Sequence, residues 1–298
     1  MRRVQSRGNE RVNSLRHAKN ILFVALASVL AACVSSGKTE PAMPRVANAI
    51  APNSYASDAS PAQQPQAAAD SESLKKGGQI LLAAAKAAGG RRLLDVKSLG
   101  MDEKGEQFNA KGHVALSVKW TVAYPDRSHG DVMFGTQPVI QTCDGKAAWI
   151  VIGAQERDVT RTIGEFKRGI ALFGGGWGLY REVLAGRVSG QAVGDAEIDG
   201  RELNGVTVDA PFGSVKLFFD PKTHLLAAAR FQTSAPQGMM EAEQRWSSYR
   251  KVDGLEFAFS TASYRGGAKL FESSVSTVRI NPPAGDSLFA KPVLAPAK

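Results

Sequence analysis

Apolar and polar residues alternate along much of the chain after residue 110. The longest example is His113 to Tyr124, in which every second residue from Val114 onward is a large apolar one. A period of two is typical of a β-strand that buries one face. Shorter runs of similar character predict further strands at 132–134, 139–142, 147–152, 183–193, 203–208, 214–219, 225–231, 241–251, 255–264 and 269–280.

Turn signals separate these strands at short intervals. Asp144-Gly145, Asp199-Gly200 and Asp253-Gly254 are dipeptides that favour tight hairpins. Asn281-Pro282-Pro283 ends the last strand. Regularly spaced short strands with such turns predict a mainly β (α+β) fold built on one antiparallel sheet that is wide enough to curve.

Two segments have the period of a helix instead. Residues 74–88 are rich in Leu and Ala, and Gly89-Gly90 ends the run. Over residues 156–173, apolar side chains recur every three or four positions, which predicts an amphipathic helix. A glycine-rich run follows: Gly174, Gly175, Gly176 and Trp177. Because a helix precedes this run and no Gly-Lys-Ser/Thr motif ends it, we expect a flexible connector or gate and not a phosphate-binding loop.

The first 33 residues form a separate unit. A basic segment precedes an apolar run from Ile21 to Ala32, and small residues lead to Cys33. This order is typical of a secretory signal peptide. The apolar run to Val34 is only 14 residues long, whereas a membrane-spanning helix needs about 20.

The end of this unit, Leu30-Ala31-Ala32-Cys33, resembles the lipobox of bacterial lipoproteins. The resemblance implies that residues 1–32 are removed and that Cys33 carries a covalent lipid, the only group we expect the chain to carry. Val34 follows the cysteine where Asp commonly marks retention in the inner membrane. The resemblance therefore favours a lipid anchor in the outer membrane, facing the periplasm. An ordinary export signal with a chance cysteine is the alternative.

Residues 33–73 join the anchor to the predicted domain. From Val34 to Ser73 the chain is rich in Ala, Pro, Ser and Gln and poor in large apolar residues. Such a segment buries too little surface to offset its ordering entropy, so we predict a disordered tether. A coil of this length has an end-to-end distance of about 35 Å. We assign the domain to residues 74–293 and a short tail to residues 294–298.

Charge and cysteine content limit the possible functions. The formal charge of +9 includes the basic leader, and without residues 1–32 the excess of Lys and Arg over Asp and Glu is four. No clustered basic face is apparent, so we expect no nucleic-acid partner. If Cys33 is lipidated, Cys143 is unpaired. It is then either buried and inert or able to form an intermolecular bridge.

Three stretches near the C-terminus resemble the outer-membrane lipoprotein-sorting superfamily, which has the LolA/LolB-like fold. They are the hairpin at residues 215–226, the segment 249–259 and the segment 278–289. The resemblance covers about 220 residues. It implies a curved antiparallel sheet forming a half-open β-barrel, with helices covering the concave face. It also implies that the concavity is apolar and binds acyl chains.

No catalytic or metal-binding motif stands out. His113, His129 and His224 are scattered, and the chain contains no H-E-x-x-H or G-x-S-x-G sequence. We therefore predict neither an enzyme nor a metal site. Any His that lay near a Ser, Cys or carboxylate in a pocket would argue against this.

Aromatic and apolar residues are the better candidates for a binding site. If they point into the half-barrel, they line a cavity covered by the 156–173 helix. The candidates are Val118, Trp120, Phe134, Trp149, Phe166, Phe218, Trp246, Phe257 and Phe259. We expect a module that binds a lipid, an acyl chain or a lipidated protein. The alternative is a non-catalytic scaffold with a filled core, and the oligomeric state is open in both cases.

Overall fold

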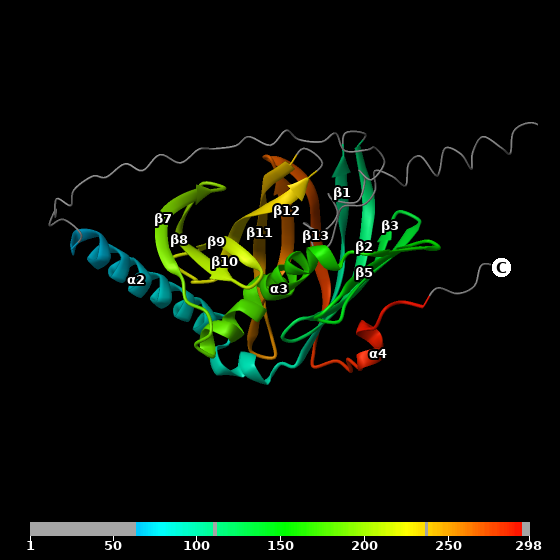
Figure 1. The fold of residues 1–298 in the computed structure, drawn as a ribbon, viewed down its shortest axis with the longest axis horizontal. Helices are drawn as coiled ribbons and strands as arrows, with labels where there is room; N and C mark the ends of the chain where they lie inside the picture. Colours follow the sequence, from blue (N-terminus) through cyan, green and yellow to red (C-terminus); the bar gives the residue numbers. More distant parts are fainter. Residues whose placement is uncertain (1–63, 110–111, 236–237, 294–298) are drawn as a thin grey trace, which may run out of the picture.

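A single antiparallel sheet of 13 strands dominates the computed structural model, which describes residues 64–109, 112–235 and 238–293. The strand order is β6-β5-β4-β3-β2-β1-β13-β12-β11-β10-β9-β8-β7. The sheet curves around helix α3 and does not close on itself (Figure 1). The predicted fold class is therefore confirmed.

Most strands pair with their neighbours in sequence through short turns. Strands β1 to β6 are Ser98–Asn109, Gly112–Ala123, Arg127–Phe134, Gln137–Cys143, Ala148–Ile152 and Gln155–Asp158. Strands β7 to β13 are Gln191–Ile198, Arg201–Ala210, Gly213–Phe219, Leu226–Ala235, Gly238–Val252, Leu255–Arg265 and Ala268–Ile280. The exception is the pairing of β1 with β13, which joins the two ends of the domain through partners such as Met101 and Val278.

The hairpins confirm the turn chemistry of the sequence. Asp199 and Asp253 have the positive φ that these turns require, at 52° and 48°. The Asp220 carboxylate accepts hydrogen bonds from the backbone N–H groups of Lys222 and Thr223, both at 2.9 Å. The hairpin that contributes to the family resemblance is thus stabilised by a side chain that caps its own turn.

Helix α2 (Gln64–Ala88) confirms the predicted first helix but begins ten residues earlier. Residues 64–73 are therefore helical and do not belong to the tether, and the rest of the predicted leader and tether lies outside the described residues. Gly77 is buried where α2 meets β7, and a Cβ there would collide with the carbonyl oxygen of Gly190. The glycine that weakens the helix locally is needed for this close approach.

Helix α3 (Ile163–Leu184) departs most from the prediction. Residues 156–162 are not α-helical: they end β6 and form the 3-10 turn η3 (Thr160–Thr162). The helix then extends past the glycine run, so the strand predicted from residue 183 begins only at Gln191. Two further short helical segments are η2 (Gly90–Asp95) and α4 (Asp286–Phe289).

The main hydrophobic core lies between the concave face of the sheet and the helices α2 and α3. It includes Leu81 of α2, Phe166 and Leu179 of α3, and the inward residues of most strands. A smaller cluster on the opposite face joins Ile198, Leu203 and Phe218 with two alanines of β10. No helix among the described residues is long and apolar enough to cross a membrane.

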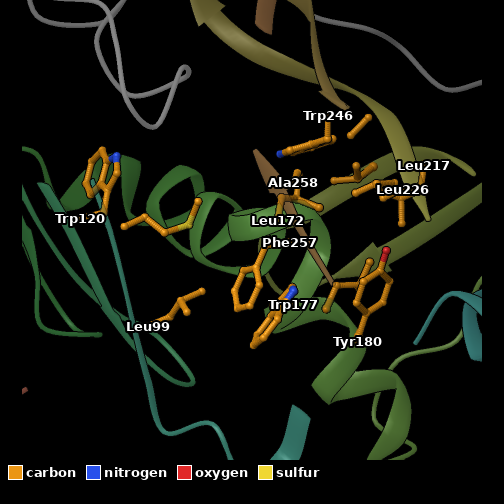
Figure 2. Close-up of a cluster of buried hydrophobic side chains, with 14 of the residues drawn as sticks. Leu99, Trp120, Leu172, Trp177, Tyr180, Leu217, Leu226, Trp246, Phe257 and Ala258 are labelled. Atoms are coloured by element: carbon orange, nitrogen blue, oxygen red, sulfur yellow. The ribbon is translucent and has the colours of Figure 1, made fainter. Parts of the chain in front are cut away.

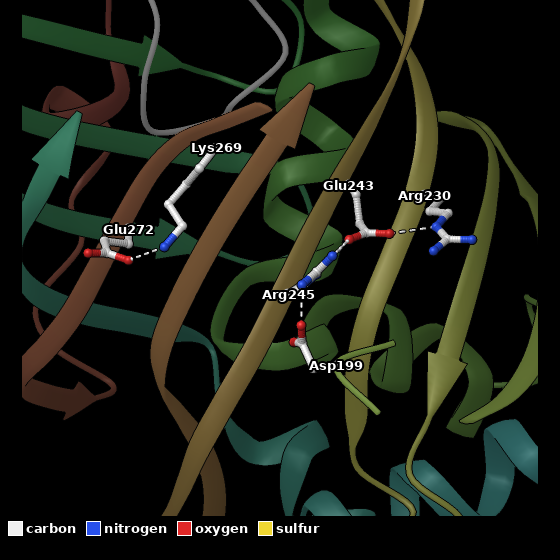
Figure 3. Close-up of polar contacts among 6 residues, drawn as sticks. All are labelled: Asp199, Arg230, Glu243, Arg245, Lys269 and Glu272. Atoms are coloured by element: carbon white, nitrogen blue, oxygen red, sulfur yellow. Dashed lines mark hydrogen bonds and ion pairs between the residues drawn. The ribbon is translucent and has the colours of Figure 1, made fainter. Parts of the chain in front are cut away.

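Charged residues of β10, β11 and β13 lie on the outer face of the sheet, beside Asp199 from the turn after β7 (Figure 3). The Glu243 carboxylate accepts hydrogen bonds from Arg230 Nε and Arg245 Nε, both at 2.6 Å, and Arg245 also pairs with Asp199 at 2.6 Å. Only 11% of the Glu243 side chain is exposed. Glu243 therefore belongs to a paired and partly buried network. No histidine or nucleophile takes part in it.

Candidate ligand pocket under helix α3

Helix α3 consists of two helical halves separated by a short left-handed segment. Phe173 is extended (φ −56°, ψ 140°), and Gly174, Gly175 and Gly176 have φ values of 66°, 96° and 105°. Three consecutive left-handed residues are accessible only to glycine without strain. The run is buried and not an exposed loop, which corrects the predicted connector.

The glycine segment is packed tightly against the core. A Cβ on Gly175 would collide with the hydroxyl group of Tyr249, and a Cβ on Gly176 would lie 3.0 Å from the Tyr180 ring. The Tyr249 hydroxyl in turn donates a hydrogen bond of 2.7 Å to the Leu226 carbonyl. The glycines therefore allow α3 to lie deep in the concave face.

Trp177 anchors the second half of α3. Its ring is fully buried and stacks on Phe257 with 4.0 Å between centroids, close to Leu99 (Figure 2). Its Nε1–H donates a 2.9 Å hydrogen bond to the Glu256 carbonyl. Arg181, one turn later, donates hydrogen bonds to the carbonyl groups of Leu93 and Val96. A residue predicted to belong to a gate is thus an anchor in this structure.

A pocket remains between the first half of α3 and the sheet. Its volume is about 50 Å³. Its sheet wall comes from β1, β2, β3 and β10 to β13, namely Met101, Glu103, Leu116, Val118, Trp120, Val122, Ser128, Phe231, Gln244, Trp246, Thr261 and Phe271. Its helix wall is Glu165, Arg168, Gly169, Ile170, Leu172, Phe173 and Gly174. We call this site the α3 pocket.

Four of the predicted site residues line the α3 pocket. They are Val118, Trp120, Trp246 and the gate residue Gly174. Phe173 meets the Trp120 ring edge-to-face with 6.4 Å between centroids. The indole rings of Trp120 and Trp246 would therefore lie close to any ligand that enters the pocket.

The other predicted residues lie elsewhere. Phe134, Phe166 and Phe257 are buried in the main core and do not line the pocket. Phe259 is half-buried at the margin of the main core and does not line the pocket either. Gly175, Gly176 and Trp177 also lie behind the pocket wall.

Phe218 and Trp149 lie apart from the main core. Phe218 belongs to the smaller cluster, with Arg230 stacked on its ring at 5.0 Å, because its neighbours Leu217 and Phe219 take the inward positions of β9. Trp149 lies between Ala148 and Ile150, which both point into the main core. Alternation along β5 therefore directs Trp149 to the other face.

Sequence reasoning missed the polar residues of the pocket. Glu103 follows Leu99 and Met101 at the spacing of one strand face, so alternation could have placed it inward. Arg168 lies outside the apolar stripe of its helix, and no sequence pattern indicates that it is buried.

Burial raises the pKa of the Glu103 carboxyl above its ordinary value of 4.5, although Ser273 Oγ donates a 2.7 Å hydrogen bond to it and acts in the opposite direction. The folded state thus binds this proton more tightly than the unfolded state. The stability that Glu103 contributes is fully present below about pH 4.5 and is lost as the pH rises through the raised pKa.

We therefore expect Glu103→Gln to stabilise the protein at pH 8, where the wild type must either bury a charge or bind a proton that the unfolded chain does not hold. Each kcal/mol gained raises Tm by about 2–4 °C for a domain of this size. The difference in Tm between variant and wild type should shrink as the pH is lowered toward 4.5. Calorimetric scans across this range test the expectation, and parallel pH profiles of the two proteins would contradict it.

Of the three histidines in the described part of the domain, only His129 lies near both a hydroxyl group and a carboxylate. Its Nδ1 lies 3.4 Å from Thr142 Oγ1, and its Nε2 lies 3.4 Å from an Asp131 oxygen. The hydrogen bond to His129 is the main cause of the lowered pKa of Asp131. Thr142 is fully buried, and none of the three lines the α3 pocket. The contact is a cross-strand polar cluster, since His129 and Thr142 are partners in the β3–β4 ladder.

The lack of a metal-binding cluster and the burial of Cys143 complete the chemistry of the described residues. They contain no group of three or more His, Cys, Asp or Glu side chains placed to hold a metal ion. Cys143 is fully buried, its thiol lies 3.6 Å from the Asp126 carbonyl, and burial raises its pKa. Cys143 is therefore buried, as the first of the two alternatives expects, and a buried thiol with a raised pKa is poorly suited to react.

No family model and no curated protein matches the sequence. Among solved structures, the chain is similar to a putative outer membrane lipoprotein-sorting protein domain from Vibrio parahaemolyticus (12% identity, 72% of this chain, 97% of that chain, TM-score 0.48). It is similar to a LolA superfamily protein from Nitrosomonas europaea (11%, 72%, 97%, TM-score 0.49). A third is a DUF1329 family protein from Desulfovibrio piger (10%, 73%, 97%, TM-score 0.48). Likenesses at this level do not indicate what a chain binds.

Proposed function

We propose that this protein is a membrane-tethered envelope lipoprotein that binds a lipid, an acyl chain or a lipidated protein in the α3 pocket. The observation that carries the proposal is the position of this pocket. It has a largely apolar and aromatic wall on the concave sheet, and its cover is a half-helix that ends at three left-handed glycines.

Binding requires the first half of α3 to move. A volume of about 50 Å³ has room for very few water molecules, whereas ligand pockets measure roughly 300–1,000 Å³. The second half of α3 is held by Trp177 and Arg181, and the first half covers the pocket. Glycine can change the sign of φ without a Cβ clash, so the segment 174–176 is suited to act as the hinge.

The proposed attachment rests on the sequence. A lipid on Cys33 would anchor the chain in the outer membrane with the domain facing the periplasm. The chain between Cys33 and the start of α2 at Gln64 would act as the tether, so the domain could reach ligands near the membrane surface. The proposal includes no enzymatic step and no partner among nucleic acids.

A brominated fatty acid tests the proposal on the delipidated full chain. Bromine quenches indole fluorescence only at close range, and two of the four tryptophans, Trp120 and Trp246, line the pocket. We expect the ligand to raise Tm and to quench part of the emission. A double Trp120→Phe, Trp246→Phe variant should lose this quenching. The matched control Trp149→Phe should retain it, since Trp149 is buried on the other face.

The second candidate function is a scaffold with a filled core, and the small volume of the α3 pocket favours it. In that case acyl ligands leave Tm unchanged and do not quench the tryptophan emission, and native mass spectrometry of the purified protein finds no bound lipid. These results together would overturn the lipid-binding proposal.

A further inference from the structure

Arg168 is the most unusual residue of the α3 pocket. Only 6% of it is exposed, although arginine is seldom buried unless it is paired with an anion. Within the described ranges, no carboxylate forms an ion pair with it, and its Nη2 is buried without a hydrogen-bond partner. The guanidinium lies over the Phe231 ring, 4.1 Å from the centroid. Stacking on the ring stabilises the flat face of the guanidinium, but it gives the N–H groups at the edge no hydrogen-bond acceptor.

The carboxylates nearby form no ion pair with this guanidinium. Glu165 lies one turn earlier on α3 and attracts Arg168 without pairing with it, while Thr233 Oγ1 donates a 3.4 Å hydrogen bond to Glu165. Glu103, on the opposite wall, accepts a hydrogen bond from Ser273. Both carboxylates thus have other partners. The pocket holds a buried cation with free donor capacity, and its wall combines apolar and aromatic side chains with a few polar ones.

Such an arrangement is costly unless an anion completes it. Removing a charge from water costs several kcal/mol, and an interior ion pair recovers this cost only with good hydrogen-bond geometry. Guanidinium N–H groups bind carboxylates and phosphates in a planar, charge-assisted manner. A ligand with an anionic end and an apolar body matches both parts of the pocket.

We propose that the ligand is an anionic amphiphile and that Arg168 binds its carboxylate or phosphate head group while the chain contacts the aromatic wall. The inference rests on the proposed function, because it names the class of ligand for the same pocket.

Head-group comparison tests the inference on the delipidated full chain. The probes share one sixteen-carbon chain and differ only at the head: hexadecanoate, hexadecyl phosphate and hexadecanol. We expect the wild type to bind at least one of the two anions about tenfold or more tightly than hexadecanol. Whichever of the two anions binds more tightly identifies the carboxylate or the phosphate as the natural head group.

Variants of Arg168 assign the preference to this residue. Arg168→Met should lose the tenfold preference and bind hexadecanol within about threefold of the wild type, and Arg168→Lys should keep part of the preference. Arg250→Met is the matched control, because Arg250 also stacks on a phenylalanine, Phe259 at 4.7 Å, but lies exposed and away from the pocket. This control should bind all three probes as the wild type does.

Two results separate the failure of this inference from failure of the proposed function. If the wild type binds hexadecanol as tightly as both anions, or if Arg168→Met keeps the preference, the inference is wrong and lipid binding stands. If no probe binds the wild type, both are wrong. The comparison of head groups on the wild type holds even if an Arg168 variant fails to fold.

Discussion

Replacing Trp177 with alanine is expected to lower the free energy of unfolding by about 3–5 kcal/mol, the usual cost of removing a fully buried indole. The variant loses the stack on Phe257 and the hydrogen bond to the Glu256 carbonyl, and leaves a cavity where the second half of α3 meets β12. Urea unfolding followed by circular dichroism measures the change.

Trp177→Phe is the control for this prediction. It keeps an aromatic ring against Phe257 but removes the Nε1–H donor, so the cost should be smaller, with about 0.5–1.5 kcal/mol from the hydrogen bond. A loss below about 1 kcal/mol for the alanine variant would show that Trp177 does not anchor the helix. The proposal that the second half of α3 stays fixed while the first half moves would then lose its main support.

Replacing Gly175 with alanine is expected to cost about 2–4 kcal/mol. A left-handed conformation alone costs an L-residue about 1–2 kcal/mol, and the new methyl group must also displace the Tyr249 hydroxyl. That hydroxyl would then lose its hydrogen bond to the Leu226 carbonyl. Thermal and urea unfolding of the purified variant measure the loss.

Gly186 provides the matched control, because it has a similar positive φ of 68° but nothing within 4 Å of a new Cβ. Gly186→Ala should therefore show only the backbone cost of about 1–2 kcal/mol. Adding Tyr249→Phe to Gly175→Ala should recover part of the steric cost, because the colliding oxygen is gone. Equal losses for Gly175→Ala and Gly186→Ala would contradict the tight packing described for the kink.

These two experiments bear on function through the two halves of α3. If the second half is the firm one, as Trp177 and Arg181 indicate, opening of the α3 pocket must occur by movement of residues 163–172 about the glycines. That half buries Phe166, Ile170 and Leu172, so opening has a cost that a ligand must offset. An acyl chain would do so by taking over the contacts with the aromatic wall.

Alternation predicted the inward residues well and, applied strictly, would have predicted more. In the predicted strand 214–219, alternation puts Leu217 and Phe219 on one face and Phe218 on the other, where the structure has them. Glu103 is in phase with Met101 and lines the pocket with it. Both cases follow from the period of two, which is a local property of the backbone.

Elements that depend on distant contacts were predicted poorly. A run of glycines ordinarily ends a helix, yet α3 continues beyond Gly176 because Trp177, Gly178 and Tyr180 pack against the sheet and the preceding half-helix. Helix α2 begins in a segment whose composition favours disorder, and its later turns pack along β7 and β8. In both cases tertiary packing outweighs local propensity.

The sequence by itself determined the strands, their hairpin turns and the curved antiparallel sheet, because side-chain alternation and Asp-Gly turns act over a few residues. The location in the outer membrane stays a prediction that rests on the leader and Cys33 alone. Only the tertiary structure decided that α3 fills the concavity, that Trp177 is an anchor, and that Arg168 is buried without an ionic partner at the pocket. Those properties arise from side chains far apart in the chain, and their burial exists only once β1 pairs with β13 and the sheet curves around α3.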